Sequence, residues 1–279
     1  MAECVGNLSK MQVNTNAGGE VDYCLPIGET LLNMNKIIGK TISIAFLKEI
    51  NCVYCGRKTK KSFSQGYCFV CMRSLAQCDT CIIKPEKCHY EEGTCREPQW
   101  GEVNCLQDHF VYLANTGALK VGITRHVSDQ ISSRWIDQGA TQAMPIYRVK
   151  NRKMSGLVET SIAKHIADKT NWRTMLKGAY PSLDLKQAWS DLKPVVELEI
   201  DGLRETYGST SVVELDSQPV DIAYPVIQYP TKIKSMNLDK FDVVTGTLLG
   251  IKGQYLMFDD DRVFNVRNAS GYKVQLTHA

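Results

Sequence analysis

The cysteines are the residues whose type and spacing most directly indicate chemistry. Nine of the eleven lie between residues 52 and 105. The first four form two Cys-x-x-Cys pairs separated by twelve residues, and each pair is a tight turn that can present two thiolates to one ion. Two such pairs complete a tetrahedral shell of four sulfurs at Zn–S distances of about 2.3 Å. The spacing therefore predicts a closed structural zinc site with the ligands Cys52, Cys55, Cys68 and Cys71.

A second group of cysteines follows directly, with less regular spacing. The preferred ligands of a second zinc ion are Cys78, Cys81, Cys88 and Cys95. Because the third and fourth sulfurs come from irregular segments, one ligand could be replaced by His89, Cys105 or His109. An iron–sulfur cluster would use the same thiolates, so the sequence leaves that alternative open. Disulfides are disfavoured, because paired spacing suits metals and the first residues do not resemble a secretory segment.

Length and composition limit the class of protein. The 279 residues are enough for two modest domains and a metal-stabilised module, and 43% hydrophobic residues is ordinary for a globular protein. No run of about 18 apolar residues occurs, so we expect no transmembrane span. The opening Met-Ala-Glu-Cys-Val lacks the basic and apolar regions of a signal peptide, which predicts a cytoplasmic location.

Charge is unevenly distributed along the chain. Residues 106–180 carry eleven Lys or Arg against five Asp or Glu, whereas residues 181–279 carry ten against fourteen. The middle segment is therefore either a surface for a polyanion or a solvated basic face. A basic turn also lies between the first cysteine pairs, where it would either compensate the charge of a four-thiolate zinc site or contact phosphate. The candidate nucleic-acid-binding residues are Arg57, Lys58, Lys60, Lys61, Arg125, Arg173 and Lys177.

The pattern of apolar residues predicts an α+β fold. Strands are expected at 21–26 and 41–47, and several short strands after residue 211. Between them, strands at 110–114, 119–124 and 145–149 alternate with helices at 129–138 and from Ser155 to about 168, in the order β-β-α-β-α. An acidic helical stretch at 184–207, broken near Pro194, would bury Val195, Leu198 and Leu203.

Four segments follow from these elements. They are an N-terminal β segment at 1–50, a double zinc-binding module at 51–108, an α/β domain with a trailing helix at 109–208, and a C-terminal β-rich domain at 209–279. Because each end of the chain alone offers little core, we expect strands from both ends to form one β-rich portion.

Short motifs in the central segment resemble those of the GIY-YIG nuclease domain. Phe110-Val111-Tyr112 stands where that family has its first motif, and Lys120-Val121-Gly122 where it has its second. Arg134 and Glu159 stand on the first and second helices, at the positions of the family's arginine and metal-binding glutamate. This resemblance covers roughly residues 109–175. The cysteine pairs together with 93–98, 120–125 and 134–140 are also similar to an uncharacterised bacterial zinc-binding family.

The GIY-YIG resemblance implies a metal-dependent phosphodiesterase site. Glu159 would hold one Mg²⁺ on a phosphate oxygen, Arg134 would neutralise charge that develops on the phosphate, and Tyr112 would orient the attacking water. The chain departs from the family because its first motif lacks the glycine and Lys120 replaces the second tyrosine. A lysine is a poor general base unless it is desolvated, but it binds phosphate well, so this replacement weakens cleavage more than binding. Each residue also has an ordinary structural explanation, as a strand aromatic, a surface ion-pair partner or a charge at a helix N-terminus.

The sequence therefore predicts a zinc-stabilised protein that binds nucleic acid, either DNA or RNA, and not a membrane. Mg²⁺-dependent cleavage by a GIY-YIG-type endonuclease is the sharper hypothesis. The alternative is a catalytically inactive GIY-YIG-like adaptor on RNA or the ribosome. A protein–protein scaffold is a third possibility, and it would show no salt-sensitive binding to any nucleic acid.

Overall fold

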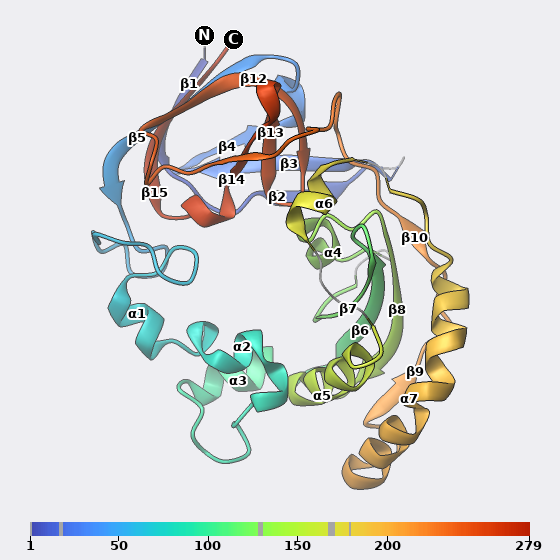
Figure 1. Ribbon diagram of the computed structural model, residues 1–279. Coiled ribbons are helices and arrows are strands. Elements are labelled where there is room, and N and C mark those ends of the chain that lie inside the picture. Colours follow the sequence, from blue (N-terminus) through green and yellow to red (C-terminus); the bar gives the residue numbers. More distant parts are fainter. Residues whose placement is uncertain (1, 17–18, 128–130, 167–170, 179) are drawn as a thin grey trace.

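Strands from both ends of the chain share one sheet. The computed structural model describes residues 2–16, 19–127, 131–166, 171–178 and 180–279. Seven strands follow the order β1-β15-β5-β12-β13-β14-β11, antiparallel except for β11 beside β14. Their bounds are β1 (Ala2–Asn7), β5 (Thr41–Ile50), β11 (Lys234–Met236), β12 (Val243–Lys252), β13 (Tyr255–Phe258), β14 (Arg262–Asn265) and β15 (Tyr272–His278). Because β5 lies between β15 and β12, the expectation that N-terminal strands complete a C-terminal sheet is confirmed, and Figure 1 shows the two termini side by side.

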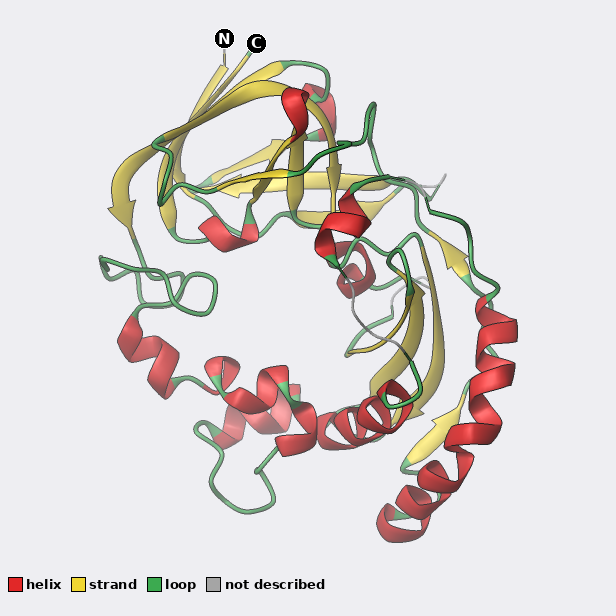
Figure 2. Cartoon of the chain, viewed as in Figure 1, coloured by secondary structure: helices red, strands yellow, loops and turns green. Residues whose placement is uncertain are grey.

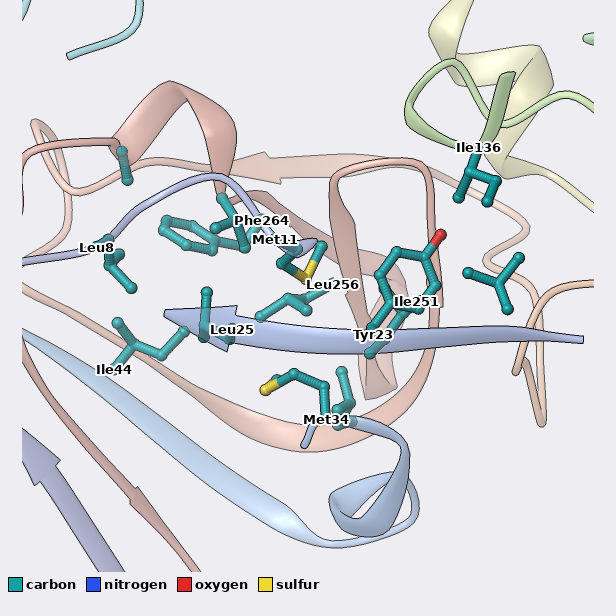
Figure 3. Close-up of a cluster of buried hydrophobic side chains, with 14 of the residues drawn as sticks. Leu8, Met11, Tyr23, Leu25, Met34, Ile44, Ile136, Ile251, Leu256 and Phe264 are labelled. Carbon is teal, nitrogen blue, oxygen red and sulfur yellow. The ribbon is translucent and has the colours of Figure 1, made fainter. Parts of the chain in front are cut away.

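A second, three-stranded sheet closes the core of this β-rich portion. It contains β2 (Gln12–Thr15), β3 (Val21–Ile27) and β4 (Thr30–Asn33), all antiparallel. Alternate residues of β3 are buried, as expected for a strand with one face on a core. Figure 3 shows Tyr23 and Leu25 of β3 among Ile44, Leu256 and residues of the other strands, with Ile136 of the central portion beside them. The β-rich and central portions therefore share one hydrophobic core.

The central portion is built on an antiparallel sheet of the order β10-β8-β6-β7, with β9 also paired to β8. Its strands are β6 (His109–Asn115), β7 (Leu119–Thr124), β8 (Gln142–Val149), β9 (Val212–Glu214) and β10 (Val220–Asp221), and its helices are α4 (Ser133–Asp137), α5 (Arg152–Ala163), α6 (Trp172–Leu176) and α7 (Leu185–Tyr207). Helices α5 and α7 pack on the sheet through a separate hydrophobic cluster. The chain order β6-β7-α4-β8-α5 agrees with the predicted β-β-α-β-α sequence of elements.

The structure corrects the expected helix boundaries. Helix α4 begins after its N-cap Ser132, and residues 128–130 lie outside the described residues. Helix α5 begins at Arg152, because the side chain of Asn151 accepts a hydrogen bond from the Met154 N–H at 2.8 Å. The prediction that Ser155 caps this helix is therefore wrong, and Ser155 is buried in its first turns. The end near 168 falls outside the described residues, since 167–170 are not among them.

Helix α7 also differs from expectation. It runs without interruption through Pro194, because tertiary packing of its buried side offsets the cost of one interior proline. That side contains Trp189, Val196 and Ile200, whereas Val195 and Leu198 are 55% and 86% exposed. Burial of Val195 and Leu198 was therefore wrongly predicted. The ring of Trp189 meets Tyr147 of β8 edge to face at 5.2 Å, and this contact fixes which side of the helix faces the sheet.

The cysteine-rich module links β5 to β6 along one side of the molecule (Figure 1). It consists mainly of loops and short helices (Figure 2). Its helices are α1 (Phe69–Ser74), α2 (Thr80–Ile83) and α3 (Pro98–Asn104), with 3₁₀ turns η2 (Ala76–Cys78) and η3 (Pro85–Lys87). Elsewhere in the described residues, 3₁₀ turns lie at η1 (Asn35–Ile37), η4 (Asp259–Asp261) and η5 (Arg267–Ala269). So little regular structure leaves the module with few buried apolar residues of its own. None of the helices that the structure describes has the length and apolar content needed to cross a bilayer.

Candidate functional site

The first two cysteine pairs form a compact cluster of sulfurs just beyond β5. The Sγ atoms of Cys52, Cys55, Cys68 and Cys71 all lie within 4.8 Å of one another, and those of Cys55 and Cys68 are 3.9 Å apart. Sulfurs that bind one zinc ion at about 2.3 Å are separated by about 3.8 Å in a tetrahedron. The four thiols therefore fit zinc, and the prediction of a four-cysteine cluster able to hold this ion is confirmed.

Local backbone geometry produces this cluster. The N–H of Cys52 donates to the carbonyl of Arg57 and the N–H of Gly56 donates to the carbonyl of Cys52, both at 2.9 Å, so the first pair lies in a tight turn. Gly56 has a φ of +70°, a conformation that favours glycine. Cys68 is the N-cap of α1, which places Cys71 in the first turn of that helix. Residues near in sequence thus build most of the site.

The sulfurs differ in their tendency to ionise. Burial opposes ionisation of Cys52, but hydrogen bonds from the N–H groups of Cys55, Cys68 and Tyr54 outweigh it and lower the pKa to about 6. Burial and the neighbouring thiols raise the pKa of Cys71. Since the thiolate is the metal-binding form, an ion would have to displace the proton of Cys71.

The basic turn lies on the outside of this cluster. All four of its predicted phosphate ligands are exposed: Arg57, Lys58, Lys60 and Lys61. Lys58 Nζ lies 3.5 Å from a carboxylate oxygen of Glu49, and Lys61 Nζ lies 5.6 Å from the ring centre of Phe63. These contacts leave both interpretations of the turn, charge compensation and phosphate binding, as predictions.

The second group of cysteines is arranged differently from the expected quartet. One small pocket is lined by Cys81, Cys88, Cys95 and Cys105, together with Asp79 and His89. Cys78 instead packs beside the first cluster. Burial raises the pKa of Cys81 to about 11, and Asp79, Cys88 and Cys105 raise it further because they would repel a thiolate. The structure therefore places Cys105, one of the expected substitutes, where Cys78 was predicted.

The other expected substitutes have different environments. His89 is part of a set with Asp79 and Cys81 whose donor atoms all lie within 4.8 Å of one another. His109 is fully buried, and its Nδ1 lies 2.8 Å from the carbonyl oxygen of Gln107. Burial lowers the pKa of His109 to about 4, so the ring is neutral at physiological pH. His109 does not line the cysteine pocket.

The central sheet brings the motif residues Tyr112 and Gly122 face to face. They are direct partners in the antiparallel pairing of β6 with β7. A Cβ on Gly122 would lie 2.6 Å from the Tyr112 hydroxyl oxygen and 2.7 Å from Cζ, so the phenol lies over the glycine. Tyr112 is fully buried, and burial raises its pKa well above the ordinary value. The glycine of the second motif is therefore required for the position of the tyrosine.

Gln138 joins Tyr112 to Arg134. With its amide oxygen toward Arg134, Gln138 accepts hydrogen bonds from Nε at 3.1 Å and Nη2 at 3.2 Å, and its amide nitrogen donates to the Tyr112 hydroxyl at 2.9 Å. This amide orientation satisfies all three contacts. Gln138 was not identified as a site residue, although its position four residues after Arg134 on a predicted helix indicated that the two share a face.

Glu159 of α5 faces the same charges. Burial raises its pKa to about 7, against the opposing effects of Lys120 and Arg134, which favour the carboxylate. Glu159 in turn contributes to the raised pKa of Tyr112. Glu159 of α5 therefore lies within electrostatic reach of the three other predicted site residues, which come from β6, β7 and α4.

Further arginines surround Arg134. Arg152 and Arg267 are largely shielded from solvent. Burial lowers the pKa of each guanidinium, and repulsion from Arg134 lowers it further. Arg125 also acts on Arg152, and its guanidinium donates to the side-chain oxygen of Asn104. Neither Arg152 nor Arg267 was identified from the sequence, because their distance along the chain from Arg134 gave no signal.

The remaining predicted nucleic-acid ligands lie on and after α6. Arg173 is 4.4 Å from the ring centre of Trp172, which stacks on Tyr255 at 5.5 Å with an interplanar angle of 4°. Trp172 packs against a small hydrophobic cluster between α6 and the C-terminal strands. Lys177 is exposed at the end of the helix. Trp172 thus covers the core.

A family model matches residues 39–274, which is most of the chain and includes both cysteine groups and the cluster around Glu159. The chain belongs to the DUF2797 family. DUF2797 is described as a protein family of unknown function, in agreement with the resemblance to an uncharacterised family. No curated protein and no solved structure gives a significant match to this DUF2797 chain.

Proposed function

We propose that this DUF2797 protein binds nucleic acid on its central portion and cleaves a phosphodiester bond there with Mg²⁺. The observation that carries the proposal is the convergence of Tyr112, Lys120, Arg134 and Glu159, from four separate elements, on one region. Burial raises the pKa of Glu159 to about 7 although cations lie beside it, and a carboxyl group perturbed in this way is a candidate functional group.

The surrounding charges support a polyanionic ligand. Arg152 is repelled by Arg125 and Arg134, and Arg267 is repelled by Arg134. Arg125, Arg134 and Arg152 donate hydrogen bonds to neutral acceptors. A cluster of like charges is unfavourable unless an anion occupies it, and a phosphate chain supplies several negative charges at once. Asp137, which lies close by, forms an ion pair with Lys10.

Each residue has a role in the proposed reaction. The Glu159 carboxylate would bind Mg²⁺, which supplies electrophilic activation of a phosphate oxygen when bound. Arg134, held by Gln138, would stabilise the charge that develops on the phosphate, and Lys120 would hold a neighbouring oxygen. Tyr112 would keep Gln138, and through it Arg134, in a fixed position. The first cysteine cluster would hold zinc and stabilise the fold at the end of β5.

Cleavage of labelled single- and double-stranded DNA and RNA with Mg²⁺ tests this proposal. We expect cutting by the wild-type protein, at least a 100-fold loss in Glu159→Ala, and no change in Glu205→Gln, which alters an exposed position of α7. Binding measured at several salt concentrations should weaken steeply as salt rises, and less steeply in Arg134→Ala. Equal cutting by the wild type and Glu159→Ala would refute the catalytic role of Glu159.

The second candidate function is a nucleic-acid-binding adaptor without catalysis. It is favoured by Lys120 at the position of the second tyrosine and by the complete burial of Tyr112, which keeps solvent water from its hydroxyl. Salt-sensitive binding without cleavage, unchanged in Glu159→Ala, is the result expected for this function. The variant Lys120→Tyr then tests whether the missing tyrosine accounts for the lack of cutting.

A further inference from the structure

Four cysteines of the second group line one pocket. Cys81 lies in α2, Cys88 follows η3, Cys95 lies in the next loop and Cys105 is the C-cap of α3. These four segments bring their sulfur-bearing side chains to one pocket wall, which Tyr90, Trp100 and Gly101 complete. Cys88 and Cys105 are buried and the other two partly buried, so the pocket is shielded from solvent.

Close contacts hold the segments that form the wall of this pocket. A Cβ on Gly101 would lie 2.9 Å from the Tyr90 ring and 3.5 Å from Cys95 Sγ, so a glycine is needed for this close approach. The Arg152 guanidinium donates to the carbonyl of Ile82 at 2.6 Å and lies 3.5 Å from that of Cys81, while its backbone N–H donates to the carbonyl of Cys105 at 2.8 Å. Arg152 therefore ties two of the cysteine segments together and places a positive charge beside the thiols.

The spacing of these sulfurs differs from that of the first site. Among the residues that the structure describes, the four sulfurs of the first site all lie within 4.8 Å of one another, whereas Cys81, Cys88, Cys95 and Cys105 do not form such a set. Sulfurs that share one zinc ion must lie close together, because every one of them binds the same atom. In a [4Fe–4S] cluster each thiolate binds a different iron, so the sulfurs lie farther apart around a central space.

The nearest alternative ligands already have partners. Asp79 forms an ion pair with Arg96 Nε at 2.7 Å, and His89 Nδ1 lies 2.7 Å from the Thr94 hydroxyl. A zinc ion held by Asp79, Cys81 and His89 would use only one of the four thiols that line the pocket.

We propose that Cys81, Cys88, Cys95 and Cys105 bind a [4Fe–4S] cluster. Four thiolates around such a cluster carry a net negative charge, and the partly buried guanidinium of Arg152 offsets part of it. The site differs from the predicted second zinc site both in its metal and in its fourth ligand. It does not depend on the proposed nuclease function.

The cluster would also fix the surface against which α5 packs. A Cβ on Gly156 of α5 would lie 2.2 Å from the backbone nitrogen of Glu86, so η3 and the helix touch backbone to backbone. Glu86 is among the charges that raise the pKa of Glu159. The loop that carries Cys81 and Cys88 is therefore in direct contact with the helix that carries Glu159.

Anaerobic purification with iron, sulfide and zinc analysis tests the proposal. We expect about four iron and four sulfide per chain, with visible absorbance that dithionite bleaches, either as isolated or after reconstitution with ferrous iron and sulfide. Cys105→Ser should lose at least three quarters of the iron and keep the zinc of the first site, which shows that the chain still folds there. Cys78→Ser should keep the iron.

Three results would overturn the proposal. One is two zinc ions per chain with the second lost in Cys105→Ser. Another is loss of iron in Cys78→Ser but not in Cys105→Ser. The third is failure to take up iron and sulfide in a reconstituted chain that retains its first zinc ion and unfolds cooperatively.

Discussion

Replacing Glu159 by glutamine should stabilise the protein at alkaline pH. Glutamine keeps the shape of the side chain and removes only its ionisation. Burial raises the folded-state pKa of Glu159 from 4.5 to about 7, so the folded protein holds this proton more tightly than the unfolded chain does. Stability therefore falls as pH rises from 4.5 to about 7, and the whole cost is present above pH 7.

The size of the effect follows from the shift. From 4.5 to about 7 is worth about 3 kcal/mol at about 1.4 kcal/mol per pKa unit. Glu159 retains some contact with solvent, which screens its interactions, so we expect Glu159→Gln to raise the free energy of unfolding by about 1–2 kcal/mol at pH 8. The gain should shrink toward pH 5 and vanish near pH 4, where both states are protonated.

Urea unfolding followed by tryptophan fluorescence at pH 5, 6, 7 and 8, in buffer without Mg²⁺, measures this difference. Glu205→Gln is the matched control and should change stability by less than about 0.5 kcal/mol at every pH. If Glu159→Gln is instead less stable than the wild type at pH 8, the carboxylate is held by Lys120 and Arg134 as a structural ion pair. That result would refute the argument that burial of the Glu159 carboxylate lowers stability and is kept because the site needs it.

Three other changes test separate parts of the structure. Gly122→Ala should lower the free energy of unfolding by about 1–3 kcal/mol, because its Cβ would lie 2.6 Å from the buried Tyr112 hydroxyl oxygen. The control Gly202→Ala, whose Cβ would meet no atom within 4 Å, should leave stability unchanged or raise it. Equal effects of the two substitutions on chemical unfolding would contradict this reasoning. Cys55→Ser should remove one zinc ion per chain in metal analysis, and unchanged zinc content would exclude the first site. Burial lowers the pKa of Lys252 from 10.5 to about 8, so the stability of the wild-type protein should rise between pH 8 and 10. This rise should be absent in Lys252→Met. If the thermal unfolding midpoints of the two proteins change with pH in parallel, this explanation is wrong.

The parts of the fold that local sequence encodes were predictable. The strands β6 and β7 and the helix α5 follow from apolar periodicity over a few residues, and Glu159 was placed on the correct helix. The boundary of α5 was not, because Ser155 and Asn151 are both good capping residues and only packing against η3 selects between them. The buried side of α7 likewise depends on where Trp189 meets the sheet.

The candidate site divides in the same way. Tyr112, Lys120, Arg134 and Glu159 were recognised from short motifs, each within its own element. Gln138 as the link between two of them, and Arg152 and Arg267 as further cations, emerge only when the elements pack. Side chains far apart in the chain meet according to the packing of the whole core, and no local pattern records that packing.

The sequence by itself determined the first cysteine cluster and the order of the central strands and helices. Cys52 to Cys71 lie within one short stretch, where tight turns and one helix N-terminus bring the sulfurs together. Only the tertiary structure decided that Ala2 pairs with His278 and that Cys105, not Cys78, completes the second pocket. These pairings bring together residues that are far apart in the chain, and closing the long loops between them costs entropy. Only the contacts of the complete core or pocket offset that cost, so the pairings cannot be read from local sequence.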